Sequence, residues 1–93
     1  MIHVLKVTAN AQDAGGSDAE LRNTLIVFVD CEDEGSAYAP ADAYLRRTGW
    51  QDIELVNCRA LPPEAAEKLD QSLRDAYQEA DSRGVSAVLL KSS

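Results

Sequence analysis

Residues 25–34 pass abruptly from apolar to acidic side chains, and this junction constrains the fold more than any other segment. Five apolar residues, 25–29, are followed by four carboxylates within positions 30–34. A strand over 24–31 carries apolar side chains on both faces, with Leu25, Val27 and Val29 opposite Ile26 and Phe28. Such a strand has to be covered on both sides by other parts of the structure.

Hydrophobic periodicity and turn residues predict three further strands and two helices. The strands are expected over 2–9, 53–61 and 85–91, and the helices over 33–48 and 62–83. Gly49 and Gly84 follow the two helices, where a left-handed residue commonly ends a helix. Lys6 and Thr8 suggest that the first strand lies near the sheet edge, and the mixed polarity of the third strand also suits an edge.

The two helices also carry signals within them. Pro40 is tolerated only in a first turn, so the first helix starts near Ala39 or has a kinked first turn. The second helix begins at Pro62-Pro63 and places acid-to-base pairs four residues apart on its exposed face. These pairs are Glu64/Lys68, Asp70/Arg74 and Glu79/Arg83.

The predicted order is β-β-α-β-α-β, which corresponds to an α+β (α/β-like) two-layer sandwich with a four-stranded mixed sheet. Helical crossovers link strands two to four, so we expect these strands to be parallel to one another. The second and fourth strands both need cover on two faces, yet there are only two helices. One helix could lie on each face. We favour two helices on one face, with a second copy of the chain covering the other face.

Length and composition fit one domain over residues 1–93. The chain has 93 residues, of which 45% are hydrophobic and 27% charged, as in ordinary globular domains. A domain of this size buries a modest share of its surface, so a homodimer through an apolar sheet face adds useful burial. Polar and glycine-rich residues over 10–23 predict a flexible loop between the first two strands.

The charge balance excludes several classes of partner. Sixteen acidic and nine basic residues give a net charge of -7, which repels nucleic acids and anionic membranes. No apolar stretch approaches the ~18–20 residues that span a bilayer, and the first residues lack the features of a secretory signal. We therefore expect a cytoplasmic protein whose two cysteines are reduced.

The acidic half of the junction is the densest group of charges in the chain. Asp30, Glu32, Asp33 and Glu34 could converge on a hard cation, or form a surface that binds a partner. Their spacing does not match an EF-hand, and carboxylates before a helix also interact favourably with its dipole. We favour the structural explanation, expect no metal site, and keep the cluster as a candidate binding surface.

Cys31, Cys58 and His3 are the other candidates for chemistry. If the second and third strands were parallel neighbours, the two thiols could face each other as a redox pair or half of a metal site. The sequence has no Cys-x-x-Cys pair, and free cysteines usually pack as small hydrophobic residues. His3 is the single histidine and is expected to be a strand residue. The glycines at 15–16 lack the spacing of a phosphate-binding loop, so neither a cofactor nor a catalytic residue is predicted.

These observations favour a small non-enzymatic module that self-associates and binds a protein or a small ligand. Its working surface would be the acidic junction together with the 10–23 loop. One alternative is an immunity-type acidic inhibitor, because the negative charge would steer the chain towards a basic protein partner. A second alternative is a metal- or thiol-dependent enzyme built from Asp30, Glu32, Asp33, Cys31 and His3.

Overall fold

The computed structural model describes residues 1–11 and 23–90, so most of the predicted 10–23 loop lies outside the described residues. Four strands and their connecting helices follow the predicted order, with two additional short helical segments. In chain order the elements are β1 (Ile2–Ala11), β2 (Asn23–Asp30), η2 (Glu34–Ser36), α1 (Tyr38–Arg47), β3 (Trp50–Ala60), α2 (Pro63–Ala66), α3 (Gln71–Arg83) and β4 (Val85–Leu90). The α+β class predicted from the sequence is confirmed.

The strands form one sheet in the order β3-β1-β2-β4. All three neighbouring pairs are antiparallel, so the prediction of a mixed sheet is wrong. β2 and β3 do run in the same direction, but β1 lies between them because the chain crosses over through α1 to the far side of β1. β1 is thus a central strand, and the edge position suggested by Lys6 and Thr8 is also wrong. β3 does lie at an edge, as predicted.

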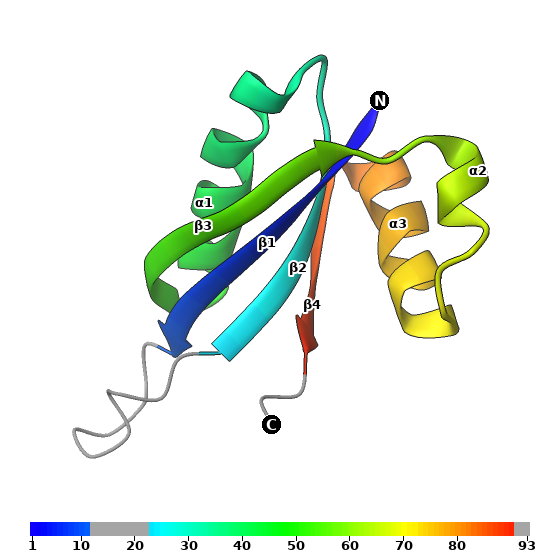
Figure 1. Cartoon of the computed structure of the whole chain (residues 1–93). Helices are drawn as coiled ribbons and strands as arrows, with labels where there is room; N and C mark the ends of the chain where they lie inside the picture. Colours follow the sequence, from blue (N-terminus) through cyan, green and yellow to red (C-terminus); the bar gives the residue numbers. More distant parts are fainter. Residues whose placement is uncertain (12–22, 91–93) are drawn as a thin grey trace.

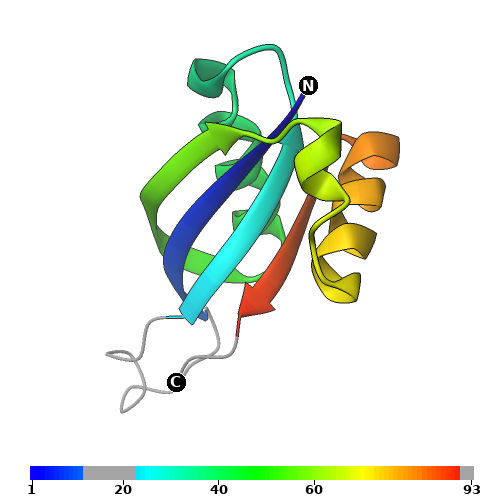
Figure 2. The same cartoon turned by 45° about the vertical axis from the view of Figure 1, so that its right-hand side comes forward.

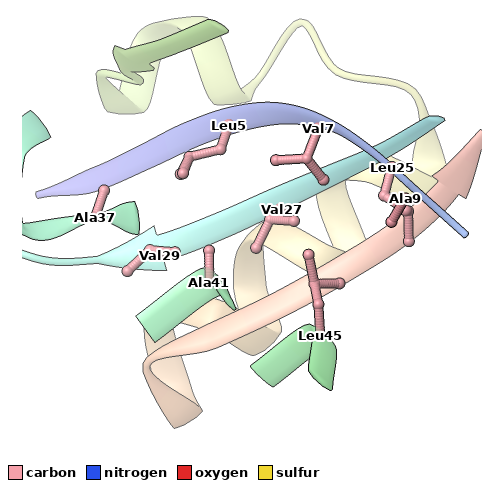
Figure 3. Close-up of a cluster of buried hydrophobic side chains, with 9 residues drawn as sticks. All are labelled: Leu5, Val7, Ala9, Leu25, Val27, Val29, Ala37, Ala41 and Leu45. Atoms are coloured by element: carbon pink, nitrogen blue, oxygen red, sulfur yellow. The ribbon is translucent and has the colours of Figure 1, made fainter. Parts of the chain in front are cut away.

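The two long helices, α1 and α3, lie on opposite faces of the sheet (Figure 1). Successive side chains of β2 point to alternate faces, so Val27 packs on the α1 side and Phe28 packs on the α3 side. Figure 2 shows α1 behind the sheet while α2 lies in front of it. Figure 3 shows the core on the α1 side, formed by Leu5, Val7, Ala9, Leu25, Val27, Val29, Ala37, Ala41 and Leu45. The core on the α3 side is formed by Ile2, Phe28, Ala76 and Ala80.

This arrangement corrects the prediction that both helices share one face, and it gives three layers, helix, sheet and helix, in place of the predicted two. The apolar residues of β2 correctly predict that both faces of this strand are covered. A single chain covers both faces, with α1 on one and α3 on the other. Phe28 is 1% exposed and Val27 is completely buried within a single copy. An uncovered sheet face is therefore no longer an argument for a homodimer.

The first helical region is divided into η2 and α1. The Asp33 carboxylate accepts a hydrogen bond of 2.9 Å from the Ser36 backbone N–H and so caps η2. Pro40 is the third residue of α1, where its missing N–H costs no intrahelical bond. Gly49 follows the helix with a φ of 101°, a left-handed conformation that glycine adopts without a steric penalty.

The second helical region is also divided, whereas the sequence predicts one helix over 62–83. α3 begins anew at Asp70, whose carboxylate accepts a 3.0 Å hydrogen bond from the Leu73 backbone N–H. Arg74 donates to the carbonyls of Glu67 and Leu69, which satisfies backbone acceptors at the break. Because Asp70 and Arg74 bind backbone groups, their predicted ion pair is absent from the described structure, whereas Glu79–Arg83 forms at 3.4 Å. Within the described residues, no helix has the length and apolar character needed to cross a membrane.

Candidate functional site

The α3 side of the sheet is covered unevenly, and this creates a groove. β3 leads directly into residues 61–70, which cross this face of the sheet at the start of β1 and reach α3 (Figure 2). The side chains of β1 on this face become more exposed along the strand: Ile2 is 4% exposed, Val4 is half-buried and Lys6 is exposed. The three residues point to the same face because strand side chains alternate. The groove lies where the helical cover ends.

The groove has a volume of about 370 Å³, within the range typical of small-molecule sites. Its apolar lining comes from β1, β2, the end of β3, the 61–70 segment and α3. The lining residues are Val4, Ile26, Phe28, Arg59, Ala60, Leu61, Pro62, Ala65, Leu69 and Leu73. None of them carries a carboxylate, thiol, hydroxyl or imidazole group. The groove is therefore chemically suited to holding an apolar group rather than to acid–base or nucleophilic chemistry.

One end of the groove is cationic. It continues into a smaller hollow that shares Val4, Ile26 and Arg59 and adds Lys6 and Asn57. Lys6 pairs with Asn57, and Val4 pairs with Arg59, so Lys6 and Arg59 are diagonal neighbours on adjacent strands. We call Lys6 and Arg59 the basic pair.

Hydrogen bonds and ion pairs within the described residues leave the basic pair uncompensated. Carboxylates are abundant in this chain, yet none lines the groove or the hollow beside it. The neighbouring hollows differ, because Glu67 lines one of them and Asp30 and Asp81 line another. The groove is thus a locally positive site on a protein of net charge -7.

The acidic junction is divided between structural roles and solvent. Asp33 caps η2, and Asp30 forms a 3.3 Å ion pair with the Met1 amino group. Glu32 and Glu34 are exposed, and Glu34 lies in the first turn of η2. The start of a helix therefore explains why Asp33 and Glu34 are acidic: Asp33 caps η2, and Glu34 lies in its first turn. Among the described residues, no three histidine, cysteine or acidic side chains are grouped so that they could hold a metal ion.

His3 and Cys31 lie together at the open end of the β1–β2 hairpin, where β1 begins and β2 ends. In the sequence they are 28 positions apart. Their Nδ1 and Sγ atoms are 3.3 Å apart, and His3 is 3% exposed. The Cys31 thiol is also within hydrogen-bonding distance, 3.3 Å, of the Asp33 carbonyl oxygen. Burial, and next the charge of Asp33, raise the pKa of the Cys31 thiol, so the pair holds a neutral thiol at neutral pH.

Cys58 lies on β3, on the far side of β1 from Cys31, so the two thiols are not on neighbouring strands. Burial raises the pKa of Cys58, the negative charge of Glu34 adds to this effect, and Cys31 adds to it once its own thiol has ionised. Both cysteines are free thiols. The parallel-neighbour arrangement that would have let the two thiols face each other is absent from the sheet.

The groove residues are not predicted from the sequence, because Lys6 suggests an edge strand and Arg59 indicates only the mixed polarity of β3. The only sign of the site in the sequence is a lysine within an apolar strand and an arginine on a later strand. Their proximity depends on the register between β1 and β3.

The fold and the groove together describe a small α+β domain with an amphipathic hollow on one sheet face. Comparison with known proteins finds no matching family model, curated protein or solved structure.

Proposed function

We propose that this protein is a non-enzymatic binding module that holds a small apolar ligand in the groove between the sheet and residues 61–73. The single observation that carries the proposal is the groove itself: it has a volume of about 370 Å³, is lined mainly by apolar side chains and leads at one end to the exposed Lys6 and Arg59. Val4, Ile26, Leu69 and Leu73 remain half-buried there, so a ligand would remove further apolar surface from water.

Binding of an uncharged fluorescent probe tests this proposal. N-phenyl-1-naphthylamine gains fluorescence in apolar surroundings, and we expect a dissociation constant of about 100 µM or tighter for a ligand of this size. Ala65→Phe places a ring in the groove and is expected to weaken probe binding at least about tenfold. Ala43→Phe, on the exposed side of α1, is the matched control and should bind the probe like the wild type. Equal binding by both variants, with circular dichroism unchanged, would contradict the proposal.

For self-association we propose the β4 edge in place of a sheet face. β4 carries no charged residue and no proline, and Leu89 on it is 55% exposed. β3, at the other edge, has register shifts in its pairing with β1 and carries Asp52, Glu54 and Arg59. Bulges and charges protect an edge strand from pairing with another chain. Two copies of net charge -7 would therefore meet with the least repulsion at β4.

The immunity-type alternative rests on the net charge and on the exposed carboxylates of Glu32 and Glu34. The enzymatic alternative rests on the contact between His3 and Cys31. The raised pKa of the Cys31 thiol is the opposite of what an activated nucleophile requires.

We also propose a cytoplasmic location. It is supported by two free thiols, which persist in reducing compartments.

A further inference from the structure

We infer that the ligand of the groove carries one anionic group, a carboxylate on an aliphatic or aromatic body, which the basic pair binds. This inference rests on the proposed function and names the class of ligand for that site. The apolar body would lie on Val4, Ile26 and Leu73, and the carboxylate would lie at the open end between Lys6 and Arg59.

The sheet register brings the two cations close together. Lys6 and Arg59 project from the same face of β1 and β3 as diagonal neighbours, whose Cα atoms are about 7–8 Å apart in antiparallel sheets. Side chains of this length can both reach one anion placed between them. Asn57, directly opposite Lys6, adds a side-chain amide donor to the same end.

The electrostatic setting favours an anion at this place. Two neighbouring positive charges repel each other, and no described carboxylate lines the groove or forms an ion pair with either side chain. An anionic group would relieve this repulsion and gain charge-assisted hydrogen bonds from the ammonium, the guanidinium or both. An anionic polymer is a poorer fit, since the rest of the chain has a large excess of negative charge.

The groove also selects for a ligand with two different ends. The apolar lining of Phe28, Leu61 and Leu69 offers no partner for a charged group, whereas the end at Lys6 is exposed to solvent. A simple inorganic anion would leave the apolar wall unused, and a pure hydrocarbon would leave the basic pair unneutralised. An amphipathic monocarboxylate satisfies both parts of the site.

Displacement of bound N-phenyl-1-naphthylamine by octanoate and by octan-1-ol tests the inference, because the two competitors share an aliphatic chain and differ in charge. At pH 7.5 and low salt we expect octanoate to compete about tenfold more effectively than octan-1-ol. In the double variant Lys6→Gln/Arg59→Gln, octanoate should compete no more effectively than octan-1-ol. The control Arg47→Gln/Arg83→Gln changes the net charge equally at exposed sites outside the groove and should keep the preference.

The outcomes separate the inference from the proposed function. If the probe binds but octanoate competes no better than octan-1-ol, the groove remains a binding site and the carboxylate inference is overturned. A preference that survives in Lys6→Gln/Arg59→Gln overturns it as well, because the anion is then held elsewhere. If neither the probe nor octan-1-ol binds to the folded wild type, the proposed function itself fails.

Discussion

The Nδ1 atom of His3 lies 3.3 Å from the Sγ atom of Cys31, a contact made by the register of the first hairpin. His3 pairs with Val29, so Cys31 lies two positions further along the same face of the sheet. The imidazole is buried, while the thiol is partly exposed and keeps its proton because its pKa is raised. This arrangement resembles a nucleophile–base pair in composition but lacks a thiolate.

Thiol titration should therefore lower the stability of the protein at alkaline pH. The folded-state pKa values of Cys31 and Cys58 are raised, so the unfolded chain loses its thiol protons first as the pH increases. The stabilising effect is lost as the pH rises from the ordinary thiol value, about 8.5, through the folded values. Urea unfolding between pH 7 and 10 should show a steeper loss of free energy for the wild type than for Cys31→Ala/Cys58→Ala. Parallel curves would contradict the raised pKa values.

Both sheet faces should contribute to stability within a single copy. Phe28→Ala on the α3 side should cost about 3–5 kcal/mol, and Leu45→Ala on the α1 side about 2–5 kcal/mol, because each removes a fully buried side chain. Val56→Ala, at a side chain on β3 that is 54% exposed, is the control and should cost far less. Chemical denaturation at two protein concentrations checks this prediction. A cost for Phe28→Ala that depends on concentration would instead indicate burial by a second copy.

The cap of α3 should be measurable by substitution. Asp70→Ala removes the acceptor for the Leu73 N–H and is expected to cost about 0.5–2 kcal/mol. Asp70→Asn retains a side-chain oxygen and should lose much less stability. Asp81→Ala, an exposed acid within α3, controls for the change in charge. If the three variants had the same melting temperature, the cap would not be a stabilising contact.

Self-association through β4 predicts a dimer in native mass spectrometry at micromolar concentration. Leu89→Lys should convert it to a monomer, because a charge on an edge strand opposes pairing between chains. Leu55→Lys, at an exposed residue of the β3 edge, is the matched control and should leave the dimer intact. A wild-type monomer, or equal disruption by both substitutions, would rule out the β4 edge as the interface.

The order of strands and helices could be predicted from the sequence because each element has its own periodicity and turn residues. The faces could not be assigned in this way. Apolar residues on both faces of β2 show that two covers are needed, but they do not identify which element supplies each cover. The break at Asp70 was hidden by an apolar stripe that continues through it, since Leu69 and Leu73 both face the groove.

The candidate site depended even more on tertiary structure. Asp33 could be recognised as a cap from its local sequence, because capping uses residues three positions apart. The contact of His3 with Cys31 and the proximity of Lys6 to Arg59 instead depend on strand register, which the sequence does not specify over such separations. Lys6 is exposed on a central strand because the helical cover ends beside it, and strand propensity carries no information about that cover.

Methyl and amide NMR of the wild-type protein, titrated with N-phenyl-1-naphthylamine, tests the central claim most directly. We predict that signals of Val4, Ile26, Leu69 and Leu73 shift progressively and saturate, while signals of the α1-side residues Leu5, Val27 and Leu45 stay in place. Shifts that cluster on the α1 side, or spectra unchanged at millimolar probe, would contradict the groove as a ligand-binding site.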